Sequence, residues 1–313
     1  MDVGVFLAME PHERAAEQDY AELIDLAQQC EELGYSSLWL ASRHFSPHYA
    51  ALPSPLVLLA AAAARTSKIK LGTCVVSLPL EKVERIAEDF ATLDAISSGR
   101  GRLGVGSGDD PPSFKALGVE FDERAGMLSK LLPHLLEVLD GADLEGNVSL
   151  YPQVRDGASK VALGAQSARG ASWAASQGVG LLQGRSEPNS LDPTVSQVRA
   201  AEAYREANPN GRVVTARSAW VGTLEDAELM EGLERYDKAM KARGRAGLPD
   251  DPKQALAKMN VIAGTAESLV KQLRAIVSDI KPDELILTPD PGGLEASDRM
   301  KRLTQLAEAF ELR

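Results

Sequence analysis

Glycine, serine and glutamine residues cluster at two points of the chain where a short apolar run gives way to a polar segment. The first is Gly106-Ser107-Gly108, and the second is Gln166-Ser167-Ala168. Exposed backbone amides and a serine at the start of a helix are groups that bind phosphate oxygens. The structural alternatives are a tight glycine turn at the first point and an ordinary helix cap at the second. Both interpretations stay open, and the functional one predicts a phosphorylated ligand.

A further group of polar residues, Arg43 and His44, follows the apolar run Trp39-Leu40-Ala41. The permanent charge of Arg43 suits stabilisation of an anion, whereas a histidine titrates near neutral pH and can transfer protons. A structural ion pair for Arg43 and a core hydrogen bond for His44 are the alternatives. His48 stands four residues after His44, but Pro47 lies between them and no acidic ligand motif accompanies them, so we expect no metal site.

The composition excludes several functional classes. With 313 residues, 44% of them hydrophobic and 25% charged, the chain is typical of a globular protein. A net charge of -11 without a basic stripe argues against binding to nucleic acid or to an anionic membrane surface. The start, MDVGVFLAMEPHER, resembles no signal peptide, and no apolar run is long enough to span a membrane, so we expect a cytoplasmic protein. The spacing of Cys30 and Cys74 matches neither a redox pair nor a zinc cluster, which predicts reduced core thiols.

Short β-rich runs alternate with longer amphipathic runs along the whole chain, which is typical of repeated βα units. We expect eight strands and nine helices, which favour a single-domain (β/α)8 TIM barrel over residues 1–313, with a doubly wound sheet as the alternative. Two stretches, 145–159 and 244–257, are too long for ordinary connections and are expected to be surface insertions. The expected strands are 3–8, 37–41, 70–76, 102–106, 160–164, 180–183, 212–221 and 284–287. The expected helices are 17–33, 54–65, 83–96, 121–139, 167–177, 192–207, 224–243, 265–279 and 295–310.

The segment from Ser54 to Gly108 is similar to the bacterial-luciferase-like family of flavin- and deazaflavin-dependent oxidoreductases. The similarity is extended, and it is weaker over most of the remaining chain. The resemblance implies a (β/α)8 barrel that holds reduced FMN, or the deazaflavin F420, at the C-terminal ends of its strands. It also implies reaction with oxygen or hydride transfer there. The matching pieces are Ala64-Arg65-Thr66, Leu71-Gly72-Thr73, Leu78-Pro79, Arg85, Ala87-Glu88, Leu93-Asp94, Ser98-Gly99-Arg100 and Gly104 to Gly108.

The same resemblance assigns places to the cofactor. The phosphate is expected at 106–108 and 166–168, the two clusters described above. The flavin ring is expected against Cys74-Val75, where many members of the family carry a non-proline cis peptide. A plain buried strand is the alternative, in which Cys74 is a structural thiol.

Three departures from the family pattern put its chemistry in doubt. Where relatives commonly have Glu-His-His-Phe, this chain has Ser42-Arg43-His44-Phe45, so a cation replaces the first histidine. An arginine that some relatives use for the phosphate is replaced by Ser107, and the pair Asp109-Asp110 follows it. The loop before Arg85 lacks the usual His-Pro. These differences weaken the expectation of luciferase-type oxygenation and predict weak FMN binding.

The leading hypothesis is an FMN-dependent monooxygenase that acts on a small organic substrate. A separate flavin reductase is expected to supply reduced FMN, because the chain carries no nicotinamide fingerprint. The alternatives are an F420-dependent hydride-transfer enzyme and a non-catalytic flavin-binding or dimer-partner protein. The run 56–64 is apolar all round, so a second copy is expected to cover it and to form a homodimer.

Overall fold

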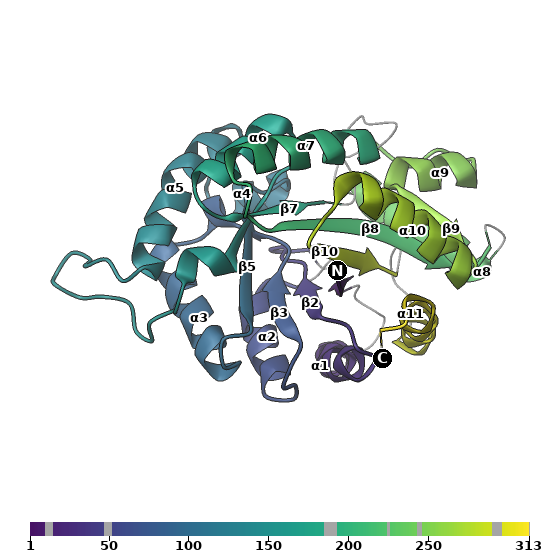
Figure 1. Ribbon diagram of the computed structural model, residues 1–313, viewed down its shortest axis with the longest axis horizontal. Coiled ribbons are helices and arrows are strands. Elements are labelled where there is room, and N and C mark those ends of the chain that lie inside the picture. The colour runs from purple at the N-terminus through teal and green to yellow at the C-terminus, as the bar shows by residue number, and fades with distance from the viewer. Residues whose placement is uncertain are drawn as a thin grey trace.

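Eight parallel strands close into a barrel, and helices surround it (Figure 1). The computed structural model describes residues 1–9, 15–46, 52–184, 193–223, 226–242, 246–289 and 296–312. The barrel strands are β1 (Asp2–Leu7), β2 (Ser37–Leu40), β3 (Lys70–Thr73) with its continuation β4 (Val76–Ser77), β5 (Gly101–Gly106), β6 (Val161–Gly164), β7 (Gly180–Gln183), β8 (Val213–Val221) and β10 (Glu284–Thr288). Because β10 pairs with both β1 and β8, the sheet is closed, which confirms the barrel and excludes the doubly wound alternative.

Eight helices follow the eight strands in turn and pack on the outside of the barrel. Two of the helices carry clear end signals: Thr265 accepts a hydrogen bond from the Ser268 amide, and Gly34 adopts a φ of +87° past the end of the first helix. The large core cluster lies between strands and helices. These helices are α1 (Ala16–Glu32), α2 (Pro55–Ala63), α3 (Val83–Ile96), α5 (Arg124–Leu139), α6 (Ala168–Ser176), α7 (Pro193–Ala207), α10 (Ala266–Ile280) and α11 (Ala296–Phe310).

Several elements depart from the simple alternation. The expected strand 70–76 is interrupted at Cys74-Val75, which leaves the short β4 paired with β5. The sequence did not predict α4 (Pro111–Ala116), α9 (Pro252–Met259) or β9 (Val261–Gly264), and α9 begins inside the segment expected to be an irregular insertion. β9 pairs with the outer half of β8, and together with α8 (Ala227–Ala242) and α9 it forms an excursion with its own small core. None of the described helices is long and apolar enough to cross a membrane.

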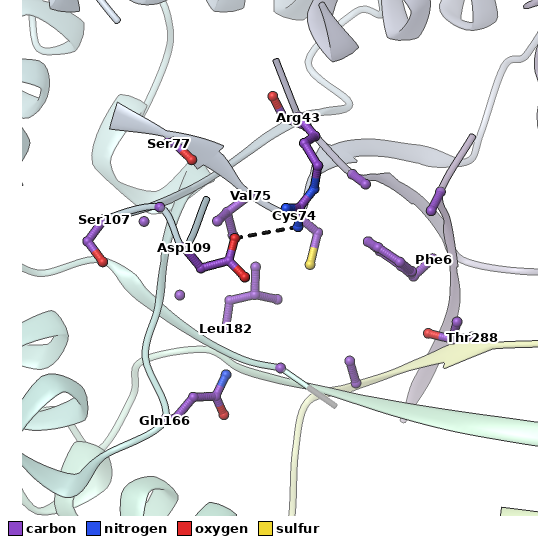
Figure 2. A pocket seen from close by; sticks show the side chains of 18 of the residues that line it. Phe6, Arg43, Cys74, Val75, Ser77, Ser107, Asp109, Gln166, Leu182 and Thr288 are labelled. Carbon is purple, nitrogen blue, oxygen red and sulfur yellow. Dashed lines mark hydrogen bonds and ion pairs between the residues drawn. The ribbon is translucent and has the colours of Figure 1, made fainter. Parts of the chain in front are cut away.

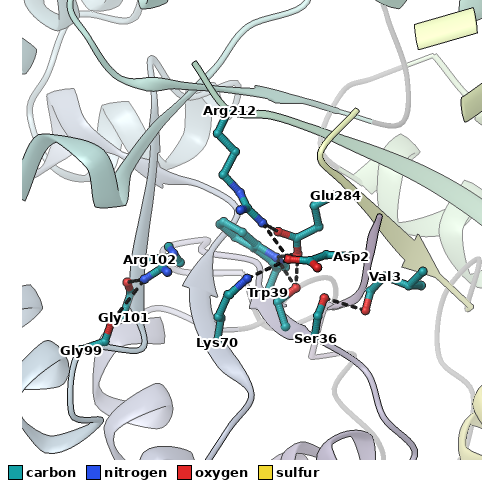
Figure 3. A network of polar contacts seen from close by, with 11 residues as sticks. Asp2, Val3, Ser36, Trp39, Lys70, Gly99, Gly101, Arg102, Arg212 and Glu284 are labelled. Carbon is teal, nitrogen blue, oxygen red and sulfur yellow. Dashed lines mark hydrogen bonds and ion pairs between the residues drawn. The ribbon is translucent and has the colours of Figure 1, made fainter. Parts of the chain in front are cut away.

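An apolar cluster that includes Trp39, Val214 and Ile286 fills the interior of the barrel, and a charged network lies at the end remote from the mouth. The indole of Trp39 occupies the space left by Gly72, where a Cβ atom would lie 2.5 Å from Trp39 Cε3. Below it, the fully buried Glu284 accepts hydrogen bonds from Trp39 Nε1 at 2.9 Å and from Arg212 at 2.5 Å (Figure 3). Burial alone would raise the pKa of Asp2, but its bonds to Lys70 and Arg212 outweigh that effect and lower it. This network joins β1, β2, β3, β8 and β10 at the end of the barrel remote from the mouth.

Glu31 at the end of α1 holds the loop that leads into β3. Its carboxylate accepts hydrogen bonds from the backbone amides of Ser67 at 3.0 Å, Lys68 at 2.6 Å and Ile69 at 2.8 Å. Burial would raise the pKa of Glu31, yet these three amides stabilise the charged form and bring the pKa below its ordinary value of 4.5. The folded state is therefore stabilised above that ordinary value, and the stabilisation is lost as the pH falls through the lowered pKa.

We expect Glu31→Gln to lower the free energy of unfolding at pH 7 by about 1 kcal/mol, because charge-assisted hydrogen bonds become neutral ones. The loss of stability between about pH 5 and pH 3 should be correspondingly smaller in the variant than in the parent protein. Urea unfolding across that pH range measures both effects. Glu32→Gln is the matched control, since Glu32 bonds only to the side chain of Gln28 among its described contacts. Equal pH dependence in the parent protein and Glu31→Gln would contradict this account.

Candidate functional site

A cavity of about 390 Å³ opens at the C-terminal ends of the barrel strands, and α8 closes one side of it. Side chains on alternate positions of a strand point inward, so the last inward position of each strand forms the floor. Most of these positions, at or just beyond the strand ends, carry small residues, which leaves room for a ligand above Trp39. The small residues lining the cavity are Ala8, Ala41, Gly106, Gly164, Gly184 and Ala216.

The peptide between Cys74 and Val75 is cis, and both residues line the cavity. A Cβ atom at Gly106 would lie 2.9 Å from Val75 Cγ2, and one at Gly164 would lie 3.3 Å from Val75 Cγ1. The two glycines therefore admit the Val75 side chain, and Val75 forms a raised apolar surface in the cavity (Figure 2). A positive φ occurs at Gly108 (+81°), whereas Gly106 serves close packing.

Arg43 projects into the cavity from the end of β2 (Figure 2). Its side chain is 14% exposed, and it forms ion pairs with Asp109 at 3.4 Å and Asp110 at 3.5 Å. Asp110 also caps α4 by accepting a hydrogen bond from the Ser113 amide, while Asp109 is 66% exposed at the rim. The charge of the Asp109-Asp110 pair is therefore partly compensated by Arg43, and Asp110 serves a structural bond as well.

His44 lies outside the set of described residues that line the cavity. Its Nε2 atom is 3.3 Å from Glu81 Oε1, and its carbonyl oxygen accepts a hydrogen bond from Ser113 Oγ. Although Arg43 and His44 are adjacent in sequence, only the first faces the cavity. His48, which sequence spacing had paired with His44, lies outside the described residues.

Of the residues predicted to bind phosphate, some line the cavity and others do not. Ser107, Gly108 and Gln166 line the cavity, whereas Ser167 and Ala168 do not. Ser167 is the N-cap residue that precedes α6, and its hydroxyl accepts a hydrogen bond from the Gly170 amide at 3.1 Å, so its role in the structure is that of a helix cap. The amide of Gln166 occupies the space left by Gly184, at which a Cβ atom would lie 2.5 Å from Gln166 Nε2.

The two cysteines have different surroundings. Cys30 is fully buried, and burial raises the pKa of its thiol to about 12, so it is a core thiol without reactivity. Cys74 is partly exposed and points into the cavity (Figure 2). The described part of the chain contains no group of three or more histidine, cysteine or acidic residues arranged to hold a metal ion.

Sequence reasoning missed several lining residues, among them Phe6, Leu182, Tyr236, Met240 and Thr288. Phe6 and Thr288 could have been found from strand alternation, because they occupy inward positions at the ends of β1 and β10. Leu182 could have been found in the same way on β7. Tyr236 and Met240 carried no such signal, since they reach the cavity from α8, four residues apart on one helix face.

Comparison with known proteins places these features in context. Residues 1–280 match the family model described as luciferase-like monooxygenase. The 4-hydroxyprotoasukamycin monooxygenase of Streptomyces nodosus subsp. asukaensis is 32% identical over 133 residues, which are 42% of this chain and 36% of that protein. Limonene 1,2-monooxygenase of Rhodococcus erythropolis is 37% identical over 131 residues, which are 41% of this chain and 33% of that protein. The chain spans between 31% and 41% of the length of several curated relatives that it matches.

Solved structures share the fold over nearly the whole chain. Monooxygenase RslO1 from Streptomyces bottropensis has a TM-score of 0.85 at 21% identity, covering 99% of both chains. The oxygenating constituent of 3,6-diketocamphane monooxygenase from Pseudomonas putida, in complex with FMN, has a TM-score of 0.74 at 18% identity, covering 100% of this chain and 96% of that one. An F420-dependent secondary alcohol dehydrogenase with an F420-acetone adduct has a TM-score of 0.74 at 17% identity, covering 98% of both chains.

Proposed function

We infer, because the chain belongs to the luciferase-like monooxygenase family, that it is an FMN-dependent monooxygenase acting on a small organic substrate. The observation that carries this proposal is the cavity at the barrel mouth, with Val75 seated over Gly106 and Gly164. In a TIM barrel this face is the place where ligands bind and chemistry occurs. FMN in the diketocamphane monooxygenase structure supports the choice of cofactor.

The residues present fit a planar ring with a phosphate tail. The apolar face of Val75 and the small floor residues suit a ring, while Ser107, Gly108 and Gln166 at one side suit a phosphate. Bound reduced FMN would supply the two electrons with which one oxygen atom of O₂ becomes water while the other enters the substrate. Arg43 would stabilise negative charge in the cavity, since a guanidinium stays protonated at physiological pH. The walls from eight strand ends and α8 would restrict access of water.

F420-dependent hydride transfer is the second candidate, and one observation favours it. Arg43 stands at the position where the family commonly has a histidine, and it cannot accept or release a proton at neutral pH. Arg43 therefore cannot take the proton-transfer role that the histidine would have in oxygenation, and this loss is the reason to consider hydride transfer. The structural neighbour with an F420-acetone adduct and the relative named F420-dependent glucose-6-phosphate dehydrogenase support this alternative.

The test is titration of the purified protein with reduced FMN under nitrogen, and separately with reduced F420, followed by admission of oxygen. The monooxygenase proposal predicts saturable binding of reduced FMN and a protein-dependent change in the rate of its oxidation. Preferential binding of F420 would transfer the assignment to hydride transfer. A protein that binds FMN but turns over no substrate would correspond to a non-catalytic flavin-binding partner, and one that binds neither cofactor would overturn the proposal.

The contact between Gly184 and Gln166 gives a prediction about cofactor binding. A Cβ at position 184 displaces the flexible end of Gln166, so we expect Gly184→Ala to keep its fold but to bind reduced FMN about three- to tenfold more weakly, the value of one hydrogen bond. The measurement is FMN titration in a double-mutant cycle with Gln166→Ala. If the effect acts through Gln166, Gly184→Ala should change little in the Gln166→Ala background; additive losses would refute this route.

We also propose that the protein is a homodimer and takes reduced FMN from a separate reductase. On α2, Leu58 and Leu59 are buried against the barrel, but Val57 on the outer side is 69% exposed. A second copy would bury this apolar surface together with the neighbouring exposed Ala61. Light scattering during size-exclusion chromatography is the measurement, and elution at monomer mass would contradict the dimer.

A further inference from the structure

Two buried hydroxyl groups stand side by side at the end of the barrel. Thr288 ends β10, Ser218 lies on β8, and the two residues are paired in the parallel register of these strands. Thr288 is 5% exposed and Ser218 is 1% exposed. Ser218 shares its strand face with Ala216, which lines the cavity, and Thr288 lines the cavity itself (Figure 2). Neither hydroxyl oxygen has a hydrogen-bond partner among the described residues.

Other buried threonines of the same barrel are bonded. Thr215 Oγ1 donates to Gln183 Oε1 at 2.6 Å, and Thr73 Oγ1 donates to the Gly104 carbonyl at 2.8 Å. Buried hydroxyl groups are normally paired, because an unsatisfied one carries a desolvation penalty. Among the described buried hydroxyl groups of the barrel strands, those of Ser218 and Thr288 are the two without a partner, and both lie at the ligand-facing end. This placement indicates that Thr288 and Ser218 bond to a group that enters the cavity.

The surroundings define the chemistry of that group. Phe6, Leu182 and Ala216 belong to the apolar cluster inside the barrel, and Met240 from α8 also lines the cavity. The charged lining residues Arg43 and Asp109 come from the ends of β2 and β5. In the order of the closed sheet, β8 and β10 lie across the barrel from β3 and β5, which carry the Val75 surface. The hydroxyl pair therefore sits in a neutral and mainly apolar part of the cavity.

We propose that Ser218 and Thr288 form the substrate-recognition subsite and bind a carbonyl or hydroxyl oxygen of a neutral, apolar organic molecule. The carbon skeleton of that molecule packs against Phe6 and Met240. The inference rests on the proposed function for its account of catalysis, but recognition of the oxygen by the two hydroxyls does not require the cofactor. A charged head group is disfavoured, because the described residues of β8 and β10 that line the cavity, Ala216 and Thr288, carry no charge.

The test uses acetophenone and toluene, which share an aromatic ring and differ in the carbonyl group. Dissociation constants are measured by NMR titration of the flavin-free protein. The parent protein should bind acetophenone about three- to tenfold more tightly than toluene, the difference expected for one or two hydrogen bonds. Thr288→Val and Ser218→Ala should each reduce this ratio, and the double variant should bring it close to one. Thr288→Ser, which keeps the hydroxyl, should preserve it.

Thr92→Val is the matched control, because the Thr92 hydroxyl bonds to the Glu88 carbonyl on the exposed face of α3, far from the cavity lining. No preference for acetophenone in the parent protein, or a preference that persists in the double variant, overturns the proposal. If the variants instead bind FMN more weakly while their preference for acetophenone over toluene stays unchanged, the proposal is also overturned, because that outcome assigns the two hydroxyls to the cofactor. If the protein prefers acetophenone over toluene but binds neither FMN nor F420, the proposed function is contradicted and the subsite proposal stands.

Discussion

Gly104→Ala is expected to lower the free energy of unfolding by about 3 kcal/mol or more, the upper range for overpacking a rigid core. A Cβ atom at this position would lie 2.0 Å from the carbonyl oxygen of Thr73 and 3.1 Å from Leu182 Cδ2. The first of these contacts is with backbone of the adjacent strand, so no side-chain rotation relieves it. The strands are also held together there, because Thr73 Oγ1 bonds to both the carbonyl and the amide of Gly104.

Because the barrel is closed, the clash between a Cβ at position 104 and the Thr73 carbonyl is expected to cost much stability. In an open sheet the edge could move outward, but here β5 is fixed between β3 and β6, and the ring of pairings continues to β10. Urea unfolding followed by circular dichroism measures the change. We expect a large fall in the midpoint, or failure to accumulate folded protein.

Gly126→Ala is the control with the opposite sign. Gly126 lies on the exposed face of α5, and a Cβ atom there would meet no other atom within 4 Å. Alanine should therefore raise the free energy of unfolding by about 0.5 to 1 kcal/mol through its higher helix propensity. If Gly104→Ala and Gly126→Ala change the free energy of unfolding alike, contact with the Thr73 carbonyl does not exclude a side chain at position 104.

The barrel could be predicted from the sequence because its signals are local. Each βα unit carries its own apolar run and a helix-like segment, and these suffice to count strands. The excursion after β8 was missed for a different reason. β9 is a four-residue strand whose residues are all partly exposed, and it depends on pairing with the outer half of β8. The indole of Trp220 anchors this region by packing against Arg302 and donating to Asp226 at 3.1 Å, which are contacts that periodicity does not reveal.

For the candidate site, the sequence located the strand ends but not the directions of side chains beyond them. Residues 74, 75, 106–108 and 166 line the cavity, while Ser167 is engaged as the cap of α6. Ala168 is the first residue of that helix and also lies outside the lining. Tyr236 and Met240 reach the cavity only because α8 is held by the Trp220 core. Such positions depend on tertiary packing, and a single sequence contains no local trace of them.

Arg43→Ala is expected to weaken binding of reduced FMN by about 10- to 100-fold, the value of a charge-assisted interaction in a partly buried site. The substitution removes the cation from the cavity and also leaves Asp109 and Asp110 without the ion pairs that now offset their charge. Both changes act against an anionic ligand. His44→Ala should alter the affinity less than threefold, a small change consistent with its contact to Glu81 and its place outside the lining.

The pH dependence of FMN binding separates the two residues further. A guanidinium keeps its charge through neutral pH, so the contribution of Arg43 to binding should not change with pH in this range. We therefore expect the affinity of His44→Ala and of the parent protein to share one pH profile between about pH 6 and pH 8. Arg65→Ala is the control, since Arg65 is an exposed arginine paired with Asp25 and should leave binding unchanged. If His44→Ala were as harmful as Arg43→Ala, the histidine would have to reach the ligand in the bound state, and the assignment of the cavity cation to Arg43 alone would be wrong.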